Sequence, residues 1–95
     1  MRVTEVVWLP QYEEKLLTKH HVLPLEAEDV LFGRPHVKFV ERGLQSDEDL
    51  FAAYGQTEEG RYLVVFFILK AGHRALVISA RDMDTKERKS YGRRK

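Results

Sequence analysis

The stretch RYLVVFFILK, residues 61–70, decides the fold. Residues 63–69 are all apolar, so both alternating sets of side chains of a strand lack charge. Such a strand lies in the middle of a sheet and must be covered on both faces. Either the chain's own helices and tails cover it, or a partner closes one side.

The segments on either side of this strand either alternate apolar and polar residues or are rich in β-branched and aromatic residues. Short polar turns separate them. Glu59-Gly60 and Ala71-Gly72-His73 are typical of tight hairpins, which favour antiparallel neighbours. Further strands are expected near residues 3–9, 36–42, 50–57 and 74–81.

Three helices are expected around this sheet. Residues 11–20 have helical spacing, and a second helix begins at Pro24 and stops at Gly33. Asp84, followed three residues later by Glu87, is typical of a capped start of a last helix. The sequence therefore predicts an α+β fold: an antiparallel sheet of four to five strands with two N-terminal helices and one C-terminal helix.

Composition limits the function classes. The 95 residues suit one domain, 1–95, and 43% hydrophobic with 33% charged residues is not a disordered composition. No cysteine is present, which excludes disulfides and thiolate metal sites and suits the cytoplasm. The histidines lack metal-ligand spacing, so no metal is expected. The longest apolar run is too short for a membrane span, and a net charge of +1 gives no global attraction for nucleic acid.

Arg81 stands where the strand near 74–81 meets the last helix. A guanidinium beside the N–H groups of a helix start can bind a phosphate-sized anion. The alternative is that Arg81 pairs with Asp82, Asp84 or Glu87.

Three stretches of the chain carry a resemblance to a known family. LTKHHV at 17–22, AAYGQTEEGRYLVVFF at 52–67 and RALVISARDMDTKERKSY at 74–91 resemble the BrnT family of bacterial toxins. The matching positions, which extend over nearly the whole chain, are Trp8, Lys19, His20, Phe32, Pro35, Gly55, Gly60, Arg61, Ile78, Ser79, Ala80, Arg81, Glu87, Arg88 and Tyr91.

The resemblance implies a RelE-like fold and the toxin of a type II toxin-antitoxin pair. Such a toxin cleaves RNA without metal or other cofactor. Its partner is a cognate antitoxin, typically of the ribbon-helix-helix type, and promoter DNA is bound only through the antitoxin complex. A homodimer is compatible with the same resemblance.

Metal-independent RNA cleavage needs a base for the 2′-hydroxyl, cations for the phosphate and an acid for the leaving 5′-oxygen. His20 and Glu48 can serve as base or acid, and Lys19 and Arg81 can supply catalytic cations. The expected site gathers Lys19, His20 and Arg81 in one hollow. The residues expected to bind RNA are Arg61, Arg88 and Tyr91.

Two positions depart from the family pattern. His21 replaces the usual Gly, and in DEDLF, residues 47–51, Leu50 falls where family members often have Arg. The alternative function is therefore a catalytically inactive protein-binding module of the same fold that acts with an antitoxin-like DNA-binding partner. A homodimeric structural protein is a third reading.

Overall fold

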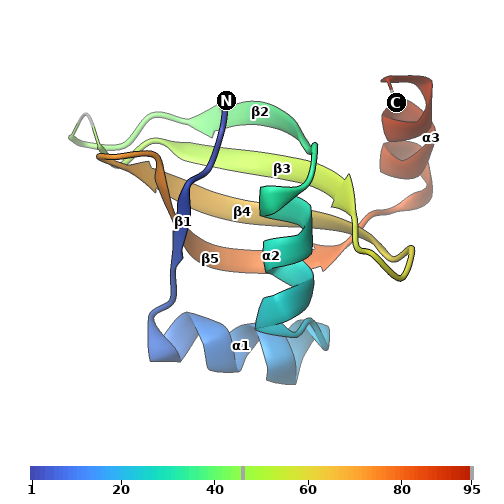
Figure 1. Cartoon of the computed structure of the whole chain (residues 1–95), viewed down its shortest axis with the longest axis horizontal. Helices are drawn as coiled ribbons and strands as arrows, with labels where there is room; N and C mark the ends of the chain where they lie inside the picture. Colours follow the sequence, from blue (N-terminus) through green and yellow to red (C-terminus); the bar gives the residue numbers. More distant parts are fainter. Residues whose placement is uncertain (46, 95) are drawn as a thin grey trace.

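The computed structural model describes residues 1–45 and 47–94, and of residue 94 only the backbone. The C-terminal part of the sequence is rich in basic residues: Lys86, Arg88, Lys89, Arg93, Arg94 and Lys95. These lie partly outside the described residues. Within them the elements are β1 (Glu5–Val7), α1 (Pro10–His20), α2 (Pro24–Phe32), β2 (His36–Glu41), β3 (Leu50–Gln56), β4 (Tyr62–Lys70), β5 (Arg74–Asp82) and α3 (Thr85–Arg94). Figure 1 shows one sheet with α1 and α2 on one side and α3 at one end.

The sheet is mixed, with strand order β1-β5-β4-β3-β2. Neighbours from β2 to β5 are antiparallel, but β1 pairs in parallel with β5, with Glu5 opposite Arg74 and Val7 opposite Leu76. The five strands, the two N-terminal helices and the C-terminal helix are confirmed, whereas the expectation of an antiparallel sheet is wrong for β1. Hairpins join β3 to β4 and β4 to β5, so those neighbours are antiparallel. β1 comes from the N-terminal end of the chain, and no tight turn connects it to β5 or sets its direction.

β4 is the central strand, as its apolar run predicts. Leu63, Val65 and Phe67 point to the face covered by α1 and α2, and all three are fully buried. Leu16 of α1 and Val30 of α2 pack into the same cluster. This main core holds both N-terminal helices on one face of the sheet.

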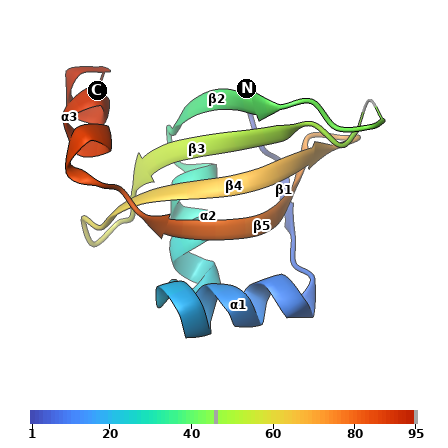
Figure 2. The same ribbon diagram turned by 180° about the vertical axis from the view of Figure 1, so that it is seen from behind.

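The opposite face of the sheet is only partly covered. Figure 2 shows α3 at one end of this face, with no helix along the rest of it. Val64 is fully buried in a small cluster with Ala52 and Met83, while Phe66 of the same strand is only half-buried. The chain therefore covers both faces of β4 at the α3 end and leaves the second face partly open farther along.

The link between α1 and α2 depends on an unusual backbone conformation. His21 adopts the left-handed region, with φ 54° and ψ 38°, and its N–H and that of Val22 bond to carbonyls in the last turn of α1. Glycine is the usual residue in this conformation because it has no Cβ. The helix therefore ends in the ordinary way although histidine occupies the position. No helix in the described part of the chain is both long and apolar enough to span a membrane.

Candidate active site

A β-bulge in β5 decides which face of the sheet carries Arg81. Two consecutive residues of β4 pair with Val77 and Ser79, which leaves Ile78 as an extra residue of β5. Val77 is buried in the main core beneath α1 and α2, whereas Arg81 lies on the face of α3. Without the bulge, the two-residue alternation of a strand would have placed Arg81 on the same face as Val77.

Arg81 pairs with Glu87 of α3 through two parallel hydrogen bonds. Nη1 donates to Oε1 at 2.7 Å and Nη2 donates to Oε2 at 3.0 Å. Nη1 also donates to the carbonyl of Asp82 at 3.2 Å, and the guanidinium lies 5.5 Å from the centre of the Phe66 ring. The hydrogen bonds raise the pKa of Arg81 and lower the pKa of Glu87. This pairing is the alternative that the sequence left open for Arg81.

The start of α3 uses the same carboxylate. The backbone N–H of Asp84 donates to Glu87 Oε1 at 2.9 Å, and the N–H of Glu87 donates to Asp84 Oδ1 at 2.7 Å. This reciprocal arrangement is the predicted capping box. A cation and a backbone donor therefore do converge on one anion, as expected, but that anion is the carboxylate of Glu87 rather than a phosphate.

Arg81 still has hydrogen-bonding capacity after these contacts. A guanidinium has five N–H groups, and Glu87 and the Asp82 carbonyl accept three of them. In residues 1–45 and 47–94, no acceptor is recorded for Nε–H or for the second hydrogen of Nη2. The side chain of Arg81 is 39% exposed, and a phosphate bound by these two donors would leave the pair with Glu87 intact.

A hollow of about 210 Å³ lies between α3 and the strands β2 and β3, beside this pair. Its lining consists of His36, Lys38, Tyr54, Lys86, Glu87, Ser90 and Tyr91. His36 stands opposite Tyr54 in the sheet, and Lys38 Nζ lies 5.3 Å from the centre of the Tyr54 ring. Burial raises the pKa of Tyr54, and the nearby Glu87 carboxylate adds to the effect. The hollow thus combines an imidazole, two ammonium groups and two aromatic rings.

Tyr91 and Arg88, two of the residues predicted to bind RNA, both contact Tyr62. The Tyr91 ring meets the Tyr62 ring edge to face at 6.1 Å, and the Arg88 guanidinium lies 4.3 Å from the centre of the same ring. These contacts hold α3 on the end of the sheet. Tyr91 also lines the hollow, so its predicted RNA contact stays a prediction with a suitable position.

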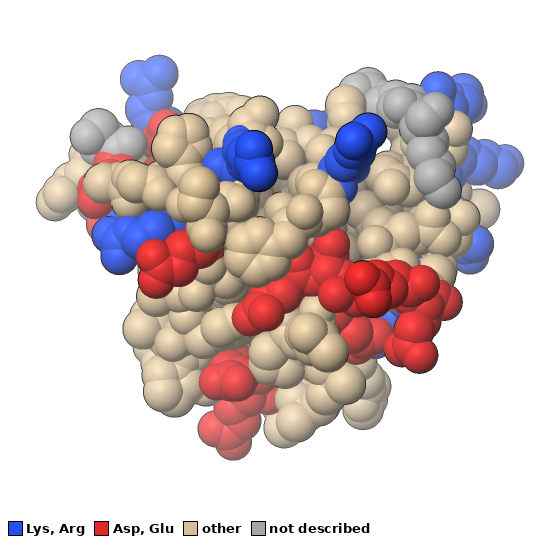
Figure 3. Space-filling view, in the orientation of Figure 1, with Lys and Arg blue, Asp and Glu red and all other residues tan. Residues whose placement is uncertain are grey.

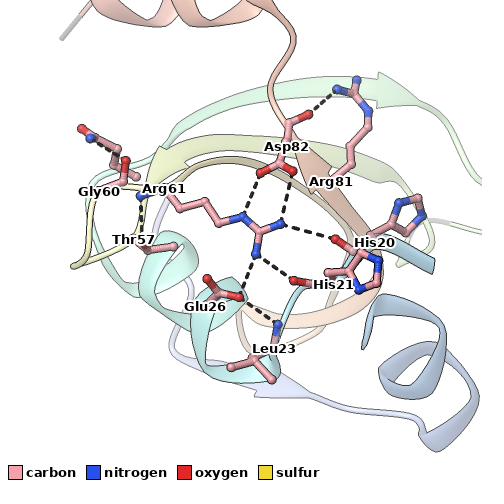
Figure 4. A network of polar contacts seen from close by, with 10 residues as sticks. His20, His21, Leu23, Glu26, Thr57, Gly60, Arg61, Arg81 and Asp82 are labelled. Atoms are coloured by element: carbon pink, nitrogen blue, oxygen red, sulfur yellow. Dashed lines mark hydrogen bonds and ion pairs between the residues drawn. The ribbon is translucent and has the colours of Figure 1, made fainter. Parts of the chain in front are cut away.

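Arg61, the third of these residues, joins four parts of the chain (Figure 4). It donates to both carboxylate oxygens of Asp82, to the carboxylate of Glu26, and to the carbonyls of His20 and His21. These five hydrogen bonds use all five of its N–H groups. Asp82 accepts from Nε at 2.8 Å, and this bond lowers the pKa of Asp82. Binding of a phosphate by Arg61 stays a prediction, but it would require giving up one of these bonds.

Lys19 and His20 do not share a hollow with Arg81, contrary to the expectation. They end α1, whose last carbonyls are held by Arg61 on the Asp82 side of β5. Neighbouring residues of a strand point to opposite faces, so Arg81 faces α3 while Asp82 faces the helix pair. In Figure 4 the guanidinium of Arg81 points away from His20 and His21.

Glu48 is also distant from Arg81. The residue of β3 level with Arg81 is Tyr54, because both pair with Val64. β3 begins four residues earlier, at Leu50, which corresponds to ~13 Å along the strand, and Glu48 lies before that point. The structure therefore separates the four predicted catalytic residues into three places.

Most residues that line the hollow beside the Arg81–Glu87 pair were missed by the sequence analysis. The sequence patterns predict no functional role for His36, Lys38, Tyr54 or Lys86. Alternation in residues 36–38 places His36 and Lys38 on one face of a strand, which was the available signal. The pairing of β2 with β3, which brings Tyr54 beside His36, could not be read from the sequence.

The family model for the ribonuclease toxin BrnT of type II toxin-antitoxin systems matches residues 8–87. The chain belongs to the BrnT family. A 1.1 Å crystal structure of the Brucella abortus ribonuclease toxin BrnT is similar in fold, with a TM-score of 0.62 and 18% identity over 85% of this chain and 97% of that chain. No curated protein sequence matches the chain.

The stretch matched to the BrnT family begins and ends at residues with structural contacts. Trp8 donates from Nε1 to Glu28 Oε2 at 2.8 Å, which ties the segment before α1 to α2. Glu87, at the other end, holds both Arg81 and the first turn of α3. As a type II toxin, a BrnT-family protein has an antitoxin as its partner.

We expect the Glu87→Gln variant to be about 1 kcal/mol less stable than the wild type near pH 7. Glutamine preserves the capping role but removes the charge that pairs with Arg81. Because the folded pKa of Glu87 is lowered, the pair stabilises fully above the unfolded pKa, and this stabilisation is lost as pH falls through the folded pKa. Urea unfolding at several pH values should show the two proteins converging in acid.

The matched control is Glu14→Gln, which removes an exposed carboxylate from α1. Its stability should follow the wild type at every pH. A Glu87→Gln deficit that stays constant down to about pH 3 would show that the charge of Glu87 is not the source of the stabilisation.

Proposed function

We propose that this protein is a ribonuclease that cleaves RNA without a metal ion, by attack of a 2′-hydroxyl on the adjacent phosphate, in the hollow beside α3. One observation carries the proposal: Arg81 has two unused N–H groups next to a hollow that contains an imidazole and two ammonium groups. The BrnT family membership supplies the reaction class, RNA cleavage.

The residues of the hollow match the chemical requirements of this reaction. Arg81 keeps its proton under all ordinary conditions, so it can stabilise the charge that grows on the phosphate. Lys38 and Lys86 add positive charge on either side. Histidine suits both proton transfers near neutral pH, so His36 is the candidate acid or base. In this scheme Glu87 positions the guanidinium and does not contact the RNA.

A second location for the proton transfers is the end of α1. Lys19 and His20 remain candidates there from the family resemblance, with Glu48 at the other end of the sheet. These three do not lie around Arg81, so a site that included them would have to use a different cation. The hollow is favoured because its lining includes both His36 and Glu87, the residue that holds Arg81.

The partners follow from the same proposal. The antitoxin is proposed to be of the ribbon-helix-helix type, with promoter DNA bound only through its complex with the toxin. The fold is proposed to be RelE-like and the location cytoplasmic. A homodimer is a further proposal.

The test is an assay of purified protein with end-labelled RNA, with and without EDTA. We expect cleavage that EDTA leaves unchanged, because the side chains supply every proton and charge that the reaction needs. The products should carry a 5′-hydroxyl and a 2′,3′-cyclic phosphate, since the attacking oxygen belongs to the RNA itself.

Two results would contradict the proposal. Products with 5′-phosphate ends would mean that water, and not the 2′-hydroxyl, attacks the phosphate. RNA that stays intact, together with normal growth on induced expression, would favour the catalytically inactive protein-binding module.

A further inference from the structure

α2 has an exposed apolar stripe on its outer side. Leu25 and Phe32 are seven residues apart, which places them on one side of the helix two turns apart. They are 68% and 52% exposed. Both line a groove of about 350 Å³ between α2 and the turn that joins β3 to β4. Two large apolar side chains that meet in one groove are more informative than single exposed ones.

The rim of this groove is acidic. Glu28 and Asp29 of α2 stand on one side and Glu58 of the turn stands on the other. Figure 3 shows the acidic side chains as a band across the face that carries α2, with Lys and Arg mainly around its edges. RNA phosphate is repelled by such a surface, and a basic partner is attracted to it.

The acidic side chains of the rim are held in position by the fold. Asp29 Oδ2 accepts from the backbone N–H of Glu58 at 3.2 Å, which ties α2 to the opposite wall. Glu28 Oε2 accepts from Trp8 at 2.8 Å. In each carboxylate the other oxygen accepts no hydrogen bond from the described residues. The groove is therefore preorganised, and a ligand does not have to order its walls.

We propose that this groove binds a basic amphipathic helical segment of a protein partner. The apolar stripe of such a segment packs on Leu25 and Phe32, and its Lys or Arg side chains reach the rim carboxylates. A helix binds an apolar groove through side chains spaced by three, four or seven residues. Leu25 and Phe32, two turns apart on α2, offer contacts over a matching length. This surface goes beyond the ribonuclease proposal and does not depend on it, because it lies on the opposite side of the sheet from the hollow beside α3.

The probe is a labelled peptide of about 18 residues made of leucine and lysine, with the leucines on one helical face. Fluorescence anisotropy at near-physiological salt should give saturable binding to the full chain. The double variant Leu25→Ser/Phe32→Ser should bind about tenfold more weakly or worse, because it removes the apolar contact. The variant should keep the far-UV circular dichroism spectrum of the wild type. Phe32 is about half-buried, so a modest fall in unfolding temperature is expected, and binding is measured well below it.

Matched controls separate apolar contact from charge. Leu44→Ser removes a fully exposed leucine elsewhere and should not change the binding of the peptide. Glu58→Lys should weaken binding severalfold, whereas Glu14→Lys, with the same charge change on α1, should weaken it much less.

Four results would overturn the proposal. If Leu25→Ser/Phe32→Ser binds the peptide as tightly as the wild type, the peptide binds elsewhere. If a scrambled peptide binds as tightly as the amphipathic one, the interaction depends only on net charge. Equal binding of a peptide with glutamate in place of lysine would remove the role of the rim. Sedimentation that shows a wild-type dimer dissociated by Leu25→Ser/Phe32→Ser would assign the groove to a second copy of this chain.

Discussion

Arg81→Ala is expected to lower the rate of RNA cleavage by about 100-fold or more. The guanidinium is the permanent cation beside the hollow, and its two unused N–H groups can follow the phosphate as negative charge grows on it. Alanine removes that stabilisation from the transition state. The measurement is single-turnover cleavage of a labelled RNA, compared with the wild type at equal concentration of folded protein.

The control is Arg42→Ala, which makes the same charge change in the exposed segment after β2. Its cleavage rate should stay within about twofold of the wild type, because a distant exposed charge affects only the encounter with RNA. An Arg81→Ala protein that stays folded and cleaves at the wild-type rate would remove the hollow as the active site.

The two histidine candidates can be separated by the same assay. His36→Ala should lower cleavage strongly if the hollow is the site, while His20→Ala should have little effect. The reverse pattern would move the proton transfer to the end of α1. It would also mean that Arg81 serves the fold rather than the reaction.

Local sequence patterns predicted most of the fold because most of its contacts are local or are set by hairpins. The apolar run of β4 and the turns on either side fixed three adjacent strands and their antiparallel order. The parallel pairing of β1 was missed because it joins residues about 70 positions apart, Glu5 with Arg74, and no turn connects them. Alternation identifies a strand but not its neighbour or direction.

The expected gathering of Lys19, His20 and Arg81 came from the family resemblance and the chemistry of RNA cleavage, and no strand pattern assigned Arg81 to a face of the sheet. Ile78 is an extra residue in β5, so the strand changes faces between Val77 and Arg81. Without this extra residue, simple alternation would place Arg81 on the buried face of the sheet, beneath α1, which carries His20. A bulge of this kind has no reliable signal in a run such as VISAR, so the choice of face required the three-dimensional structure.

At His21 the structure keeps a conformation that the local sequence disfavours. His21 stands where the family usually has glycine, yet the backbone keeps the left-handed conformation. The hydrogen bonds of the helix end and the bond from Arg61 to the His21 carbonyl hold it there. Tertiary contacts outweigh a local preference against this conformation that is worth about 1–2 kcal/mol.

Arg61→Ala is expected to reduce the free energy of unfolding by about 2–3 kcal/mol. The substitution leaves the carboxylates of Asp82 and Glu26 without their cation and the last carbonyls of α1 without a donor. The expected loss is smaller than for a fully buried pair, because the Asp82 side chain is 64% exposed and water can replace part of the contact. Urea unfolding near neutral pH measures it.

Two further variants test whether the network, rather than charge alone, is responsible. Arg61→Lys keeps the charge but cannot make five directed hydrogen bonds, so it should recover less than half of the loss. Arg74→Ala removes an exposed arginine of the same sheet with one backbone contact and should cost less than about 0.5 kcal/mol.

The Arg61→Ala variant also decides whether Arg61 serves the fold or binds RNA. If Arg61 holds α1, α2 and β5 together, then Arg61→Ala should lose stability but retain cleavage at a temperature where it is folded. If it binds RNA, as the family resemblance implies, stability should change little and cleavage should fall. A double-mutant cycle with Asp82→Asn gives the coupling energy of the pair, and a value near zero would show that the close contact between the two side chains contributes little to folding.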